Sequence, residues 1–247
     1  RLGVDEDDIN GNLRAILEDS LRLSPEAAAA AAVGVLTTES RSEWARHREH
    51  LERISPDNGR FLERIDSALL VLCLDDDSPE EPSDIAAACL HGSYRLEGDV
   101  QVGTVGNRWY DKIQLIVFAN GKAGTCFEHT WIDGHTVLRF VSDVFSDIIY
   151  RFADSITSSE EGVSYFPLPE GKAITRRLEA HFPQKIEWDL DDDLRRGLYF
   201  AETRISDLVA QHEVKVLEYT TFGKRFITSN RRVPDAFVQM SIVLGYY

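Results

Sequence analysis

The clearest pattern of apolar and polar positions lies in the middle of the chain. Residues 113–119 are predicted to form a strand, and residues 124–128 to return from an Asn-Gly turn signal as a second strand that ends at His129. Residues 134–151 have the apolar spacing of a helix. Its apolar positions are Val137, Phe140, Val141, Val144, Phe145, Ile148 and Ile149. The pattern therefore predicts a β-hairpin that leads into a helix, with His129 between them.

Periodic apolar positions elsewhere predict further elements. Helices are predicted over residues 5–19, 41–54, 61–69, 85–90, 191–208 and 236–244, and strands over residues 68–74 and 214–219. Irregular segments are predicted over residues 92–106 and 156–172. Ser40 and Glu43 have the spacing of a capping box, and Pro234 suits the first turn of a helix whose apolar part is predicted to be buried. Together the elements predict an α/β fold.

Charge narrows the classes of ligand. The chain has 247 residues and a formal net charge of −15, which argues against nucleic-acid binding because that requires a basic surface. An anionic ligand would need a local basic cluster to offset this charge. The dense basic cluster of the sequence consists of Lys224, Arg225, Arg231 and Arg232. A basic loop is more often solvated than ligand-binding, so both interpretations stay open for these residues.

The sequence gives no sign of a metal site or a membrane span. Cys73, Cys89 and Cys126 lack metal-ligand spacing and indicate a reducing compartment. Residues 75–77 are three adjacent aspartates without helper ligands, and a turn is predicted there instead of a metal site. No apolar run is long enough to cross a bilayer.

His129 is the candidate catalytic base. A neutral imidazole can accept a proton near pH 7, and a strand end next to a turn would present it to a substrate. Asp133 follows four residues later and can reach back towards the ring or another cation. A purely structural histidine is the alternative, but the strand end, the aspartate and the glycine that follows it together favour catalysis.

Several motifs resemble the choline/carnitine acyltransferase family. They comprise Asn107-Arg108-Trp109-Tyr110-Asp111-Lys112 before the predicted hairpin, and Glu128-His129 followed by Asp133-Gly134 after it. Residues 36–41, 73–76, 90–92 and 127–140 are more narrowly similar to the carnitine palmitoyltransferases of the mitochondrial matrix. The resemblance covers nearly the whole chain, and the motifs occur in the order of the family.

The resemblance implies a fold and a set of site residues. The implied fold is that of coenzyme A-dependent acyltransferases, which is chloramphenicol-acetyltransferase-like, with a mixed sheet and helices. Residues 1–182 would form a first domain with the catalytic His129, and residues 183–247 the truncated start of a second. By resemblance, Lys224 and Asp235 lie in the segments that bind coenzyme A phosphates. Thr228 departs from the family, which often has a second lysine there.

The implied function is transfer of a medium- or long-chain acyl group between coenzyme A and carnitine, with His129 as general base. Acyl-coenzyme A would be a substrate, and no permanently bound cofactor or metal is expected. The resemblance also implies a location in the mitochondrial matrix or at the inner-membrane surface, with peroxisomes as the alternative, and it allows peripheral association with a membrane.

Two alternatives to the carnitine acyltransferase remain open from the sequence. The chain is expected to be a fragment, because family members continue beyond Tyr247 with a Ser-Thr-Ser oxyanion element and residues that hold the carnitine carboxylate. The polypeptide could then act as a non-catalytic binding module. Choline as the acceptor, or another acyltransferase with the same histidine motif, is the remaining alternative.

Overall fold

The structure is a computed structural model. It describes residues 6–24, 27–28, 32–97, 100–130, 132–157 and 183–247. The chain divides into two compact units, Arg1–Glu213 and Val214–Tyr247. The two domains expected over residues 1–182 and 183–247 remain a prediction.

The first unit is rich in helices and contains a small mixed sheet, as expected for an α/β protein. Its described α-helices are α1 (Glu6–Ser20), α3 (Arg41–Ile54), α4 (Pro56–Ser67), α5 (Pro82–His91), α6 (Gly134–Thr157) and α7 (Asp192–Gln211). Its described strands are β1 (Val71–Asp75), β2 (Arg95–Glu97), β3 (Val100–Val102), β4 (Gln114–Phe118) and β5 (Ala123–Cys126). Two 3₁₀ helices are η1 (Val33–Thr38) and η2 (Thr104–Asn107).

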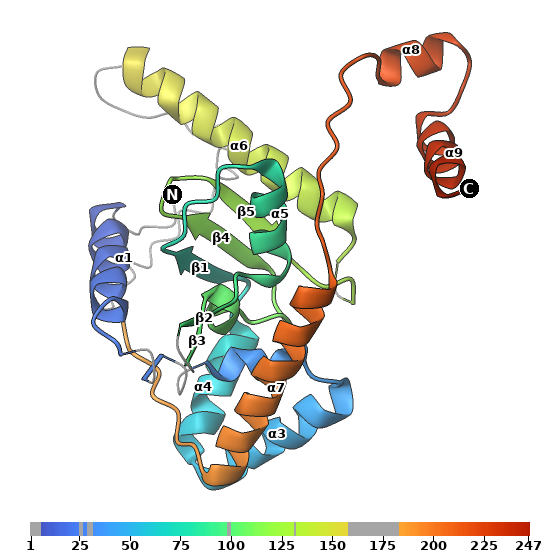
Figure 1. The fold of residues 1–247 in the computed structure, drawn as a ribbon. Helices are drawn as coiled ribbons and strands as arrows, with labels where there is room; N and C mark the ends of the chain where they lie inside the picture. The colour runs from blue at the N-terminus through green and yellow to red at the C-terminus, as the bar shows by residue number, and fades with distance from the viewer. Residues whose placement is uncertain (1–5, 25–26, 29–31, 98–99, 131, 158–182) are drawn as a thin grey trace. The chain divides into compact units, whose positions relative to one another are not determined.

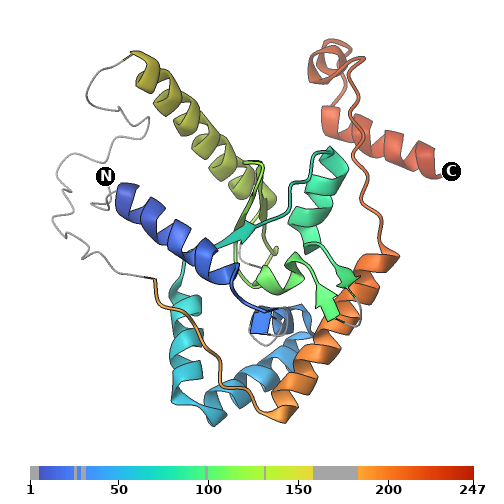
Figure 2. The same cartoon turned by 60° about the vertical axis from the view of Figure 1, so that its left-hand side comes forward.

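The three-stranded sheet has the order β1-β4-β5. β1 and β4 are parallel, and β4 and β5 are antiparallel. A parallel pair needs a long crossover, which here includes α5. Figure 1 shows the three strands side by side with α5 against the sheet, and Figure 2 shows α6 on the opposite side of the sheet from α5. The sheet therefore lies between the helix that precedes the hairpin and the helix that follows it.

The predicted hairpin is confirmed, but its second strand ends earlier than expected. The Phe118 N–H donates to Lys122 O at 2.9 Å, which closes a three-residue loop with Gly121 at φ 80°. β5 ends at Cys126, whose partner Gln114 is the first residue of β4. Because β4 offers no partner beyond this point, the prediction that the strand reaches His129 is wrong.

Two buried clusters hold the first unit together. The larger one joins η1, α3, α4 and α7 and includes Trp44 and Trp109, whose rings meet edge to face at 5.8 Å. The smaller one lies between the sheet and α5 and contains Cys73, Ala88 and Ile116. The Ser40 half of the capping box predicted for α3 is confirmed, since the Glu43 N–H donates to the Ser40 hydroxyl at 3.3 Å, whereas the Glu43 carboxylate accepts a hydrogen bond from Arg46 at 3.1 Å.

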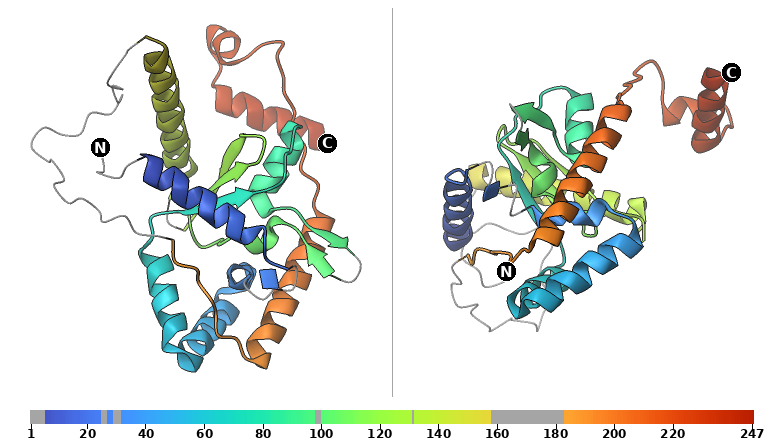
Figure 3. Two further views of the ribbon diagram at one scale, coloured as in Figure 1. Left: turned by 90° about the vertical axis from the view of Figure 1, so that its left-hand side faces the viewer. Right: turned by 60° about the horizontal axis from the view of Figure 1, so that its bottom comes forward.

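Two other predictions for the first unit need correction or fall outside the described part. Residues 92–106 are not simply irregular, because they contain β2, β3 and most of η2. The β2–β3 pair is antiparallel and separate from the three-stranded sheet (Figure 3, left). Most of the segment predicted as irregular over residues 156–172 lies outside the described residues.

The second unit contains two helices, α8 (Lys224–Ser229) and α9 (Pro234–Tyr246). Pro234 opens α9, as predicted, since the first turn of a helix tolerates the missing N–H of proline. The strand predicted over residues 214–219 is absent, because alternation alone does not supply a pairing strand. The segment 236–244 is exposed in this structure, so its predicted burial is not observed within the chain.

Candidate active site

The structure places His129 in a turn just beyond β5 and brings it close to Asp133. His129 Nε2 lies 3.6 Å from Asp133 Oδ1, which is within reach of an ionic attraction but longer than a hydrogen bond. The side chains are 77% and 79% exposed, so the ring is accessible to a substrate. The two residues that the sequence assigned to catalysis are therefore neighbours in space.

The turn that carries His129 is held from both sides. On the strand side, the Cys126 thiol donates to Leu90 O of α5 at 3.6 Å. On the helix side, the ring of Phe127 lies 3.7 Å from the position that a Cβ on Gly134 would take. The Val137 N–H donates to Asp133 O at 3.3 Å, so Asp133 also begins the hydrogen bonding of α6. α6 begins at Gly134, where the apolar spacing predicted it.

The predicted coenzyme A residues lie in the second unit. Lys224 is the first residue of α8, and Asp235 is in the first turn of α9. The hydroxyl of Thr228, where the family often has lysine, donates to Lys224 O at 3.0 Å. This threonine bonds to the backbone of its own helix and adds no positive charge. The roles of Lys224 and Asp235 in ligand binding remain a prediction.

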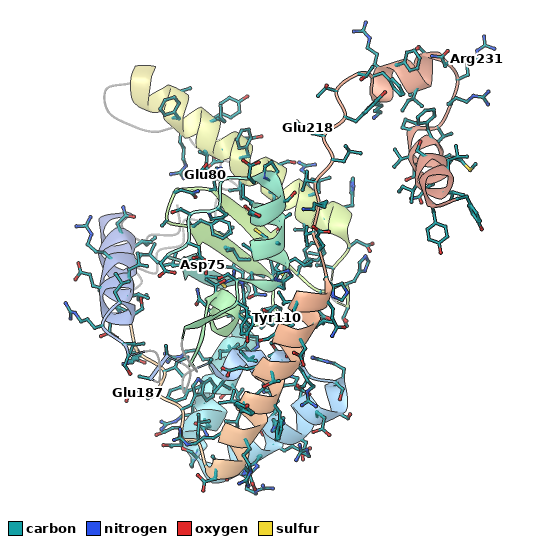
Figure 4. All side chains as sticks on the ribbon, in the orientation of Figure 1. Asp75, Glu80, Tyr110, Glu187, Glu218 and Arg231 are labelled. Atoms are coloured by element: carbon teal, nitrogen blue, oxygen red, sulfur yellow. The ribbon has the colours of Figure 1, made fainter. Side chains whose placement is uncertain are left out.

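Asp75 and Arg108 form a buried ion pair that the sequence did not reveal. Arg108 Nη1 and Nη2 donate to Asp75 Oδ1 and Oδ2 at 2.9 and 2.8 Å. Asn107 also donates to Asp75 Oδ1 at 3.0 Å. Figure 4 shows Asp75 and Tyr110 inside the first unit. The signal that could have indicated the pair is an aspartate at the end of an apolar strand and an arginine in a later motif.

Two of the three aspartates at residues 75–77 have structural roles. Asp75 is engaged by Arg108, and Asp77 Oδ2 accepts a hydrogen bond from the Ser93 hydroxyl at 2.7 Å. Among the described residues, no group of three or more His, Cys, Asp or Glu side chains could hold a metal ion. No helix in the described part of the chain combines the length and apolar character needed to cross a membrane.

The three thiols are poorly suited to nucleophilic catalysis. Burial raises the pKa of the Cys73 thiol to about 11, although nearby Arg108 acts in the opposite direction. Burial also raises the pKa of Cys89 and of Cys126. Because the thiolate is the reactive form, a raised pKa leaves little nucleophile near neutral pH. This chemistry favours a mechanism based on the exposed imidazole over one based on a cysteine.

Comparison with known proteins identifies the class as acyltransferases. Residues 2–247 match the family described as Choline/Carnitine o-acyltransferase. The chain belongs to the choline/carnitine O-acyltransferase family, and the resemblance seen in its motifs is confirmed.

The chain is similar to enzymes whose names specify different acyl groups. A putative mitochondrial carnitine O-acetyltransferase of Saccharomyces cerevisiae is 40% identical over 96% of this chain and 37% of its own length. Mitochondrial carnitine O-palmitoyltransferase 2 of Xenopus tropicalis is 31% identical over 98% of this chain and 32% of its own length. Peroxisomal carnitine O-octanoyltransferase of Bos taurus is 32% identical over 87% of this chain and 32% of its own length. The chain thus spans about a third of the length of these relatives.

Proposed function

We propose that the natural protein containing this chain transfers an acyl group between coenzyme A and carnitine, with His129 as the general base. The observation that carries the proposal is the exposed His129–Asp133 pair in a chain that matches the acyltransferase family over residues 2–247. The names of the relatives support carnitine as the acceptor. The medium or long acyl chain rests on the resemblance in the motifs.

The proposed reaction begins with removal of the hydroxyl proton of carnitine by the imidazole of His129. The resulting alkoxide attacks the thioester carbonyl of acyl-coenzyme A and forms a tetrahedral oxyanion. Collapse of this intermediate breaks the carbon–sulfur bond, and the proton held by His129 passes to the leaving thiolate. General-base catalysis of this kind needs the base within hydrogen-bond reach of the hydroxyl. The exposure of His129 is compatible with that approach.

Asp133 is proposed to orient the ring of His129. Its Oδ1 atom lies 3.6 Å from Nε2. In the protonated intermediate state, this carboxylate would attract the imidazolium. Because both groups are exposed to water, the attraction is weak, and orientation is the larger part of the proposed role.

Coenzyme A is proposed to contact the second unit through its phosphates. Lys224 offers an ammonium group at the start of α8, and a lysine acts on phosphate as a point charge. Asp235 lies in the segment that follows the basic residues Arg231 and Arg232. We infer that coenzyme A is a substrate and that the fold belongs to the chloramphenicol-acetyltransferase-like class.

A mitochondrial location is proposed, with peroxisomes as the alternative. Two of the similar proteins are named as mitochondrial and one as peroxisomal. Peripheral association with a membrane also remains part of the proposal.

An acyl-exchange assay tests the proposed function. The natural protein containing residues 1–247 is incubated with acetyl-, octanoyl- or palmitoyl-coenzyme A and either carnitine or choline, and free coenzyme A is measured. The proposal predicts release that depends on carnitine, with a preference for octanoyl or palmitoyl. Release that depends on choline alone would support the alternative acceptor. No acceptor-dependent release with any of these pairs would overturn the acyltransferase proposal and favour a binding module.

A further inference from the structure

The last turn of α5 receives hydrogen bonds from three side chains outside the helix. The final carbonyl groups of a helix have no partner within it and must be satisfied from elsewhere. Ala88 O accepts from the Gly92 N–H and from Arg108 Nη2, both at 3.0 Å, and His91 O accepts from the Tyr110 hydroxyl at 2.9 Å. Leu90 O accepts from the Cys126 thiol at 3.6 Å. We call Arg108, Tyr110 and Cys126 the α5 clamp.

The α5 clamp joins the helix to the three-stranded sheet. Cys126 is the last residue of β5, and Arg108 and Tyr110 lie a few residues before β4. Arg108 is held in turn by Asp75, the last residue of β1. The end of one helix is thereby tied to the segments that lead into or out of every strand of the sheet.

This arrangement matters for His129 because β5 is a short edge strand. It pairs only with β4 in the described part of the sheet, and the pairing stops at Cys126. Beyond Cys126 the chain leaves the sheet and reaches His129 three residues later. The Cys126 thiol therefore holds the end of β5 to α5 three residues before His129.

We propose that the α5 clamp positions His129, with Cys126 as the nearest positioning residue and Tyr110 as a second. The clamp holds the end of β5 against α5, and the hydrogen bonds that Asp133 O accepts from the Thr136 and Val137 N–H groups fix the start of α6. His129 lies between these two anchors. The link to catalysis rests on the proposed function, whereas the mechanical link between Cys126 and the turn does not.

Three cysteine variants separate this role from general packing. Cys126→Ala removes the donor to Leu90 O, whereas Cys126→Ser retains a hydroxyl donor. Cys89→Ala removes a thiol from α5, the helix that carries Leu90, and the Cys89 side chain packs against Gly124 of β5. Cys89 is the matched control because its thiol contributes packing against the same strand.

Amide hydrogen exchange in the natural protein gives the first readout. Cys126→Ala is expected to speed exchange in the segment 133–137, where the Thr136 and Val137 amides donate to Asp133 O at 2.9 and 3.3 Å, by about 10-fold or more, since weaker local anchoring raises the population of open states. Cys126→Ser should recover part of the protection, and Cys89→Ala should leave this segment close to wild type. Unchanged exchange in Cys126→Ala, or an equal effect of Cys89→Ala, would overturn the positioning role.

Kinetics give the second readout. Displacement of a catalytic group by about 1 Å can cost on the order of 100-fold in rate, so Cys126→Ala should lower kcat by roughly 10- to 100-fold with little change in KM. Tyr110→Phe, which loses only the hydroxyl, should also lower kcat. It replaces Cys126→Ala as the test variant if Cys126→Ala folds poorly. A wild-type protein without acyl transfer would overturn the proposed function, and the exchange result would still decide the mechanical link. Loss of thermal stability with unchanged kcat in both variants would contradict positioning.

Discussion

Asp75 and Arg108 form a bidentate ion pair in which neither side chain is exposed to solvent. The two N–H···O distances are 2.9 and 2.8 Å, and Arg108 also donates to Ala88 O of α5. The pair joins the end of β1 to the segment before β4. Such a pair is costly to desolvate, but removal of one partner leaves an uncompensated buried charge.

Asp75→Asn should therefore destabilise the protein strongly. The variant keeps the shape of the side chain and leaves Arg108 without its counter-charge, which typically costs about 3–5 kcal/mol. Urea unfolding followed by circular dichroism measures the loss. The control is Glu80→Gln, which breaks the solvent-exposed pair with Lys122 and should change stability little. Equal losses in both variants would contradict the assigned importance of burial.

His47 of α3 is buried against α7. Its side chain lies so close to Gly197 that a Cβ there would come within 2.5 Å of the ring, and only 6% of His47 is exposed. Burial lowers the pKa of His47 from its ordinary value of 6.5, and nearby Arg46 lowers it further. The carboxylates of Glu43 and Glu39 act in the opposite direction but do not reverse the shift.

A lowered pKa in the folded state predicts a loss of stability in mild acid. The unfolded chain binds a proton at His47 near pH 6.5, while the folded chain resists it, so stability is lost as the pH falls from above 6.5 towards the lower folded pKa. His47→Gln should flatten the pH dependence of the free energy of unfolding in this range. The same slope in the wild-type protein and in His47→Gln would contradict the lowered pKa.

Gly34 allows η1 to approach the segment that carries Arg108. A Cβ at Gly34 would lie 2.0 Å from Arg108 O, which is main-chain and cannot rotate away. Gly34→Ala should therefore cost about 1–3 kcal/mol or more in the free energy of unfolding. Gly11→Ala is the matched control, because nothing lies within 4 Å of its Cβ position on α1 and alanine favours helix. A neutral Gly34→Ala would show that the close approach is not required.

The local elements were predictable wherever a short sequence signal determines the backbone. Asn120-Gly121 indicated the turn, and Ser40 with Glu43 indicated the start of α3. The end of β5 was missed because it depends on where β4 begins, which is a relationship between distant segments. The burial of Asp75 was missed for the same reason, since its partner Arg108 is far away in sequence.

Alternation and apolar character were less reliable in the second unit. The alternation of residues 214–219 suggested a strand, but a strand also requires a partner. The spacing of His129 and Asp133 did predict their proximity, because four residues around a turn cannot separate them far. The α5 clamp could not be predicted, since its donors come from two segments that meet only in the folded sheet.

Lys224→Ala should weaken coenzyme A binding if the basic cluster formed by Lys224, Arg225, Arg231 and Arg232 contacts phosphate. A hydrogen bond to a charged group contributes about 1.5–3 kcal/mol, so the KM for coenzyme A should rise several-fold or more, with a smaller effect on carnitine. The penalty should shrink as salt rises, because screening weakens exposed ionic contacts. Steady-state kinetics at low and high ionic strength measure both effects.

The control for Lys224 is a lysine of the first unit. Lys185 Nζ lies 3.7 Å from Asp19 Oδ2 and 3.8 Å from Glu187 Oε1. Lys185→Ala therefore changes the net charge by the same amount as Lys224→Ala and leaves the basic cluster unaltered. The same KM change in the two variants would indicate a general charge effect. Wild-type coenzyme A kinetics for Lys224→Ala at low ionic strength would contradict phosphate binding by this residue.

The most direct test of the account is acyl transfer by His129→Ala in the natural protein. Loss of a general base typically lowers the rate by ~10²–10⁴-fold, and the exposed position of His129 should leave the fold intact, as thermal unfolding can verify. His135→Ala, at the nearby exposed histidine of α6, should retain wild-type activity. The account predicts that carnitine-dependent release of coenzyme A is nearly abolished in His129→Ala alone. Wild-type turnover by a folded His129→Ala protein would contradict the assignment of His129 as the catalytic base.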